Sequence, residues 1–281
     1  MNKALSQNQL DHLLEFIGYG RLDADIWFIS MEELGSDEEK VRTRLKFEQV
    51  DDISKTIPQP DEKAPISGLR GMCEIVLRLD NINPTNDLLK EYQSDHLGRL
   101  DGSTLLCTLM PVPNFGDDEI IYKKIIPQYA SQKACYEAIK TDRFDLFRQL
   151  IEENRPKIVI AAGSEYWSEY QELFNQFTFS DHDQFLVGWD TDTVVILTGE
   201  LDSPEMQEKF VEIVSIIHEN ALSIDTSTHS KTPIVSEAEI KRQKKLAARQ
   251  TAVAKRKPSA THDPADPYCV CAYCLKYEAN E

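Results

Sequence analysis

The chain has 281 residues, of which 41% are hydrophobic, and a formal net charge of −17. This length suffices for one sizeable domain with a tail or for two modest domains, and we expect the first. No apolar run approaches the roughly 20 residues that a transmembrane helix needs, and the first residues lack the apolar stretch of a signal peptide. We therefore expect a cytoplasmic protein without a membrane partner.

Charge is divided unevenly along the chain. Residues 1–230 carry 21 basic and 42 acidic side chains, whereas residues 231–281 carry ten basic and six acidic ones. Because nucleic-acid affinity arises largely from cations that displace condensed counterions, the acidic body argues against strong non-specific binding of nucleic acid. Phosphate contacts are expected from the basic end instead.

The first predicted elements are an amphipathic helix over residues 6–18 and a strand over residues 25–30. The strand reads D-I-W-F-I-S, an unbroken apolar run typical of a strand buried on both faces in a mostly parallel sheet. Glu32 and Glu33 follow it directly. Since function in such sheets sits at the carboxyl ends of the strands, both are candidate catalytic residues. The alternative is that they are solvated carboxylates at the start of the next helix.

The middle of the chain alternates helical and extended patterns. Helices are expected over residues 36–50, 68–79, 87–93 and 131–154, the last with a break allowed at Thr141-Asp142, and a surface loop over residues 51–67. Buried strands are expected over residues 103–109 and 157–163. Arg155-Pro156 is expected to end the helix that precedes the second of these strands.

The remaining elements complete an alternating order. We expect a helix over residues 165–174 and then a polar pair of edge strands over residues 177–189. A buried strand over residues 193–198 and a helix that begins at Pro204 are expected to follow. This order predicts an α/β protein: a three-layer α/β/α domain over residues 1–222 with a four-stranded, mostly parallel central sheet.

Residues 223–260 are predicted to form a Ser/Thr-rich linker and a basic arm. The arm lies on a helix-favouring background, and it is expected either as an exposed helix or as a disordered segment. Its candidate nucleic-acid-binding residues are Lys241, Arg242, Lys244, Lys245, Arg249, Lys255, Arg256 and Lys257.

Residues 261–281 form a Cys-rich tail. Cys269, Cys271 and Cys274 follow a C-x-C-x-x-C spacing that suits a metal better than a disulfide framework in a cytoplasmic protein. His262 is the candidate fourth ligand of a tetrahedral zinc site, while no cofactor is expected for the main domain. The alternative is that the tail cysteines are reduced and bind nothing. Cys73, Cys107 and Cys135 stand in apolar contexts and are expected in the core.

Four strand ends are expected to converge on one rim, and with their loops they suggest a family resemblance over roughly residues 16–220. Gly18-Tyr-Gly20 with residues 26–35 resembles the first motif of the uracil-DNA glycosylase superfamily, and residues 155–163 resemble a later core strand of that family. The resemblance implies a DNA N-glycosylase, a hydrolase of base excision, in which Glu32 or Glu33 would match the water-activating acid. Substrate-binding positions would be Pro113, Asn114, Phe115, Gly163 and Glu200.

One departure from that family concerns the loop after the last strand. Where the family carries a His-containing loop, this chain has Thr198-Gly-Glu-Leu-Asp-Ser-Pro204, and Glu200 adds negative charge where the base anion would develop. The alternative is therefore a catalytically inactive α/β scaffold that binds a basic protein partner. His182, in Asp181-His182-Asp183, does not match the missing residue by order, and that cluster suits either a metal or a solvated turn.

Overall fold

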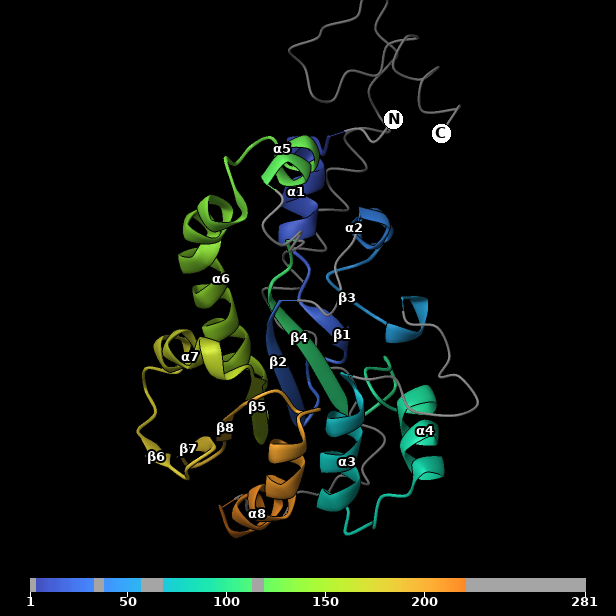
Figure 1. Ribbon diagram of the computed structural model, residues 1–281, viewed down its shortest axis with the longest axis vertical. Coiled ribbons are helices and arrows are strands. Elements are labelled where there is room, and N and C mark those ends of the chain that lie inside the picture. Colours follow the sequence, from blue (N-terminus) through green and yellow to red (C-terminus); the bar gives the residue numbers. More distant parts are fainter. Residues whose placement is uncertain (1–3, 33–37, 57–67, 113–118, 221–281) are drawn as a thin grey trace, which may run out of the picture. The chain divides into compact units, whose positions relative to one another are not determined.

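The structure is a computed structural model that describes residues 4–32, 38–56, 68–112 and 119–220 (Figure 1). Several predictions fall outside these ranges and are not tested by them. They concern Glu33, the loop residues Pro113, Asn114 and Phe115, the linker and basic arm, and the Cys-rich tail with His262, Cys269, Cys271 and Cys274.

An α/β domain is confirmed, and its centre is the set of four buried strands that the apolar runs predict. These are β2 (Ile26–Glu32), β4 (Thr104–Met110), β5 (Ile158–Ala162) and β8 (Val194–Thr198). They lie side by side in the order β4-β2-β5-β8, and every neighbouring pair is parallel. Burial on both faces explains why their sequences show no polar alternation.

The predicted number of four strands is wrong, because the sheet contains eight in the order β3-β1-β4-β2-β5-β8-β7-β6. Two of the four further strands, β6 (Phe179–Asp181) and β7 (Phe185–Trp189), are the polar edge pair expected over residues 177–189. The other two, β1 (Gly18–Gly20) and β3 (Val50–Asp51), were not predicted. The sheet is mixed, since β1 pairs antiparallel with β4, and the hairpin of β6 and β7 continues antiparallel from β8. Strands as short as β1 and β3 carry too few residues to show a period in the sequence.

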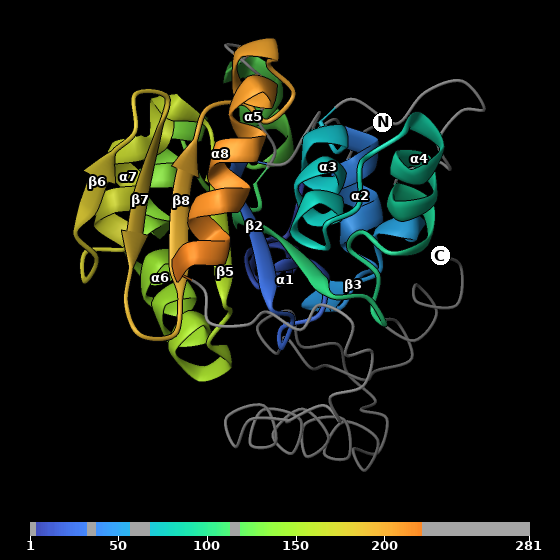
Figure 2. The same cartoon turned by 90° about the horizontal axis from the view of Figure 1, so that it is seen from below.

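Helices cover both faces of the sheet (Figures 1 and 2). One hydrophobic cluster joins the sheet to α1 (Gln7–Leu14), α2 (Glu38–Arg44), α5 (Glu119–Ile125), α6 (Gln132–Asn154) and α7 (Trp167–Leu173). The other cluster joins it to α3 (Arg70–Leu79), α4 (Asn86–Asp95) and α8 (Pro204–Asn220). Side chains of β2 divide between the clusters as alternation requires: Trp27 and Ile29 face the first, and Phe28 faces the second.

Most helix predictions are confirmed with shifted ends. The first helix ends at Leu14 rather than at residue 18, because the chain then enters β1. Helix α6 continues without a break through Thr141-Asp142 and ends where Arg155 takes a left-handed conformation before Pro156. Cys73, Cys107 and Cys135 are buried, as their apolar contexts predict. None of the helices within the described ranges has the length and hydropathy to span a bilayer.

Candidate functional site at the carboxyl ends of the strands

The strand order creates a topological switch point between β2 and β5. From β2 the chain passes to β4 on one side, and it later returns to place β5 and then β8 on the other side. Open α/β sheets bind ligands at such points, beyond the carboxyl ends of the strands. We use the name switch-point rim for the residues at these ends of β2, β5 and β8: Glu32, Gly163, Glu165, Tyr166 and Glu200.

Glu32 is the last residue of β2, and its side chain is half-buried. Its Oε1 accepts a hydrogen bond from Gln132 Nε2 at 2.9 Å. Gln132 is the first residue of α6, whose N-cap is Ser131. The amide therefore orients the carboxylate from a neighbouring element. Gln132 lies a hundred residues further along the chain, so no local pattern in the sequence points to this contact.

Gly163 ends β5 in a way that shapes the switch-point rim. Its φ of 112° lies in a region that residues with a side chain rarely adopt. A Cβ atom there would stand 3.0 Å from Cδ2 of Tyr166, so the glycine lets this ring pack back over the strand end. The Gly163 amide donates to the Thr198 carbonyl at 3.1 Å, which ties the ends of β5 and β8 together.

Two further aromatic residues, Tyr170 and Trp167, lie close to Tyr166 in the chain and bind the ends of β5 and β8. Tyr170 is fully buried, donates its hydroxyl to the Ala162 carbonyl at 2.7 Å, and contacts the Tyr166 ring edge-on at a centroid distance of 6.4 Å. Trp167 donates its indole N–H to the Thr198 carbonyl at 3.0 Å. Tyr166 itself remains half-exposed, and the charge of Glu32 acts on its phenol.

The switch-point rim is strongly negative. Partial burial raises the pKa of Tyr166, and the charges of Glu32, Glu165, Glu169 and Glu200 raise it further. Partial desolvation also raises the pKa of Glu200, with added contributions from Glu165 and Asp202, although the Glu200 side chain is largely exposed. The carboxylates at or after the ends of β2, β5 and β8 therefore act on the same phenol, and Glu165 also acts on Glu200.

Asp202, in the loop after β8, has a structural role that the sequence did not reveal. Its carboxylate accepts hydrogen bonds from the backbone amides of Gly68 and, at 3.2 Å, of Gly71. It thus satisfies amides at the start of α3, where Leu69 provides no side-chain cap. These bonds fix the loop after β8, which carries Glu200, to the start of α3, a segment 131–134 residues earlier in the chain.

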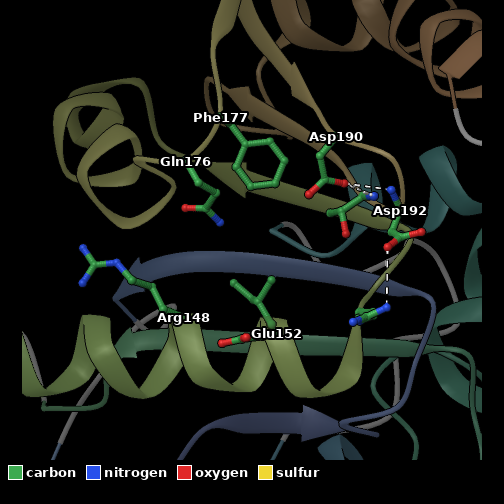
Figure 3. Close-up of a pocket in the computed structure, with 9 residues that line it drawn as sticks. Arg148, Glu152, Gln176, Phe177, Asp190 and Asp192 are labelled. Carbon is green, nitrogen blue, oxygen red and sulfur yellow. Dashed lines mark hydrogen bonds and ion pairs between the residues drawn. The ribbon is translucent and has the colours of Figure 1, made fainter.

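A separate pocket of about 410 Å³ lies at the opposite edge of the sheet, where β5 and β8 begin (Figure 3). Phe177 forms an apolar wall, while Asp190 accepts bonds from the amides of Asp192 and Thr193 within its own turn. Arg148 is committed to the carbonyls of Leu173 and Glu172. No predicted site residue lines this pocket.

The predicted site residues within the described ranges thus converge: Glu32, Gly163 and Glu200 meet at one rim. In these same ranges, no group of three His, Cys, Asp or Glu side chains is arranged to hold a metal ion. Gln132 and Tyr166 are the rim partners that sequence reasoning missed. A scan against protein-family models and searches of curated proteins and solved structures gave no significant match to this chain.

Proposed function

We propose that this chain recognises a base in nucleic acid and releases it by hydrolysis of the N-glycosidic bond. The observation that carries the proposal is the carboxylate of Glu32, which Gln132 orients at the switch point beside Tyr166. Cleavage of an N-glycosidic bond develops positive charge on the sugar, and a fixed carboxylate both stabilises that charge and orients water. A base flipped out of the stack would lie on the Tyr166 ring.

The resemblance to the uracil-DNA glycosylase superfamily supports this function through the position of Glu32 after the first long strand. This chain lacks the histidine that the family carries after the last strand, and this difference affects which base the chain would release. Glu165 and Glu200 would repel a base that departs as an anion, as uracil does, but not a base that departs neutral. We therefore rank N-alkylated purines, which carry a positive charge before cleavage, ahead of uracil as substrates.

Affinity for the nucleic-acid backbone is assigned to the basic arm, because the body is acidic. Lys241 to Lys257 would supply the phosphate contacts, and the tail with Cys269, Cys271 and Cys274 remains a predicted zinc site. Binding that weakens steeply with added salt, and that is lost on deletion of residues 231–281, would support this assignment.

The first test is a base-release assay on single- and double-stranded DNA that contains uracil or N7-methylguanine. Glu32→Gln keeps the shape of the side chain but removes its charge, so we expect release to fall by about 10²-fold or more. Glu33→Gln tests the neighbouring carboxylate, and Glu137→Gln, on the exposed face of α6, is the matched control. Equal rates for the intact chain and Glu32→Gln would contradict the role of Glu32.

The alternative function is a protein-interaction module without catalysis. The observation in its favour is the clustering of Glu32, Glu165 and Glu200 around one half-exposed aromatic ring, which suits a basic segment of a partner protein. Failure of the intact chain to release either base, together with salt-sensitive binding to a basic protein that Glu200→Gln weakens, would favour this function.

A further inference from the structure

A second group of side chains with catalytic chemistry lies away from the switch-point rim. Ser180 Oγ, on β6, lies 3.2 Å from Nε2 of His182, and Nδ1 of His182 lies 3.9 Å from Oε1 of Glu212, on α8. We propose that Ser180, His182 and Glu212 act as nucleophile, general base and orienting carboxylate in the hydrolysis of small carboxylic esters. This proposal is independent of the function assigned to the switch-point rim.

The hairpin of β6 and β7 places the first two residues together. Residues two apart in a strand project to the same face, and Phe185 and Val187, opposite them on β7, belong to the hydrophobic cluster that contains the buried side of α8. Ser180 and His182 therefore face α8. The β6–β7 turn, in which Asp183 takes a φ of 70°, returns the chain so that the imidazole stacks on the Phe185 ring at a centroid distance of 5.1 Å and an interplanar angle of 12°.

The order of contacts matches the roles that acyl transfer requires. A carboxylate beside Nδ1 favours the tautomer that carries its proton there, which leaves Nε2 free to accept the hydroxyl proton of Ser180. The 3.9 Å separation from Glu212 is longer than a hydrogen bond, and catalytic contacts commonly shorten only once substrate is bound. Lys209, whose Nζ lies 3.3 Å from the other Glu212 oxygen, holds that carboxylate from the far side.

The resting position of the Ser180 hydroxyl has two acceptors. Its Oγ lies 3.2 Å from the Val187 carbonyl as well as 3.2 Å from His182 Nε2. Because one hydroxyl proton serves both, attack requires it to point at the imidazole rather than at the strand. Deprotonated His182 provides that acceptor.

The edge of the sheet supplies a candidate donor for the oxyanion. Within the described ranges β6 is the last strand of its sheet, and the His182 amide donates to Phe185 across the hairpin. Since successive amides of an antiparallel strand alternate in direction, the Asp181 amide points away from β7. It follows the nucleophile in the chain, which is the position of an oxyanion donor at other serine nucleophiles.

The reaction would proceed in two balanced steps. Ser180 Oγ bonds to the ester carbonyl carbon while its proton passes to Nε2, and that proton then leaves with the alcohol as the C–O bond breaks. Water next attacks the acyl-serine, gives its proton to His182, and releases the acid as Ser180 recovers that proton. His182 is 30% and Glu212 46% exposed, so a small ester can reach the group from solvent.

The test uses the full chain with a fluorophosphonate probe and p-nitrophenyl acetate. The probe forms an Oγ–P bond and loses fluoride only at an activated serine, so we expect one adduct, located at Ser180 by peptide mass spectrometry. Ser180→Ala should abolish the adduct, and His182→Asn should lower both labelling and ester hydrolysis by about 10²-fold or more. Glu212→Gln should lower them less, since it acts through His182.

Two controls separate the proposal from non-specific reactivity. Ser215→Ala removes an exposed serine of α8, and Glu208→Gln removes an exposed carboxylate of the same helix. Both should leave labelling unchanged. Absence of an adduct at Ser180, or an adduct that His182→Asn does not affect while circular dichroism shows a folded chain, would overturn the proposal.

Discussion

At the scale of single residues, Arg143 shows how strongly one buried side chain can join separate elements. It lies on α6 with only 3% of its surface exposed, and its guanidinium donates to the carbonyls of Leu14, Phe16, Thr108 and Leu109 at 2.7–3.0 Å. Burial lowers the pKa of Arg143 to about 9. The Arg143 side chain thus links α6 to the end of α1, to the segment before β1 and to the carboxyl end of β4.

Replacing Arg143 by Met should therefore destabilise the chain strongly. The substitution roughly keeps the apolar volume but removes the donor of four carbonyl groups, three of them in buried contacts. Since an unsatisfied buried polar group costs about 1–3 kcal/mol, we expect a loss of about 3 kcal/mol or more in the free energy of unfolding. Urea denaturation followed by circular dichroism measures it.

Lys133→Met, near the start of the same helix and more exposed, is the control for the change in charge and chain length. It should alter stability by less than about 0.5 kcal/mol. Similar losses in the two variants would show that the carbonyl contacts of Arg143 do not carry its effect.

At the scale of single residues, residue type and local sequence context predicted some placements correctly. The strand that ends in Glu32 and the three buried cysteines follow from apolar context alone. The partners of Glu32 do not, because Gln132 and Tyr166 come from helices far along the chain. Distant polar contacts leave no periodic trace in a sequence, so only the fold reveals them.

At the scale of elements, α3 depends on tertiary contacts at its start. The Asp202 carboxylate caps its first amides, and Gly71, in its first turn, lies directly against the loop after β8. A Cβ atom on Gly71 would stand 2.5 Å from the Leu201 carbonyl oxygen and 2.8 Å from Leu201 Cβ. Helix and loop could not approach this closely with any other residue.

Gly71→Ala should consequently destabilise the chain, although alanine is the better helix-forming residue. Alanine in place of glycine favours a helix by about 1 kcal/mol, but the clash with backbone forces α3 and the loop apart. Overpacking of this kind costs about 1–3 kcal/mol, and we expect a net loss of stability in thermal or urea unfolding.

Ser215→Ala offers the matched comparison, because Ser215 lies on the exposed face of α8. The change there improves the helix preference and removes one exposed hydrogen bond, from Ser215 Oγ to Glu219 Oε1 at 3.3 Å, so stability should stay about equal. A gain of stability in Gly71→Ala would contradict the close approach of α3 to Leu201.

At the scale of the whole molecule, several weakly acidic groups are buried, and their burial makes the folded chain less stable at alkaline pH. Burial raises the pKa of the Cys73 thiol from 9.0 to about 12, and it also raises the pKa of Cys107, Tyr122 and Tyr170. Above pH 9 the unfolded chain loses protons that the folded chain keeps. Folding is then opposed, so stability is full below about pH 9 and falls as pH rises towards 12.

We expect the free energy of unfolding to fall steadily from pH 9 to pH 11.5, with Cys73 alone contributing about 1.4 kcal/mol per pH unit. Arg143 and Arg44 have the opposite sign, because burial lowers the pKa of both and so makes stability rise with pH, but they are two groups against several. Urea unfolding at intervals of half a pH unit measures the slope. Cys73→Ala should be less stable at pH 7 and show a shallower slope, and an unchanged slope would contradict the role of Cys73.

The sequence by itself determined the α/β class, the four buried strands and the helices between them, because burial on both faces and helical periodicity are local patterns. It also placed a carboxylate at the end of the first long strand. Only the tertiary structure decided that the sheet has eight strands, that the chain reverses between β2 and β5, and that Glu32, Tyr166 and Glu200 share one rim. The reason is physical: short strands gain their stability from pairing with distant segments, and a site built from several strand ends exists only once the sheet has brought them together.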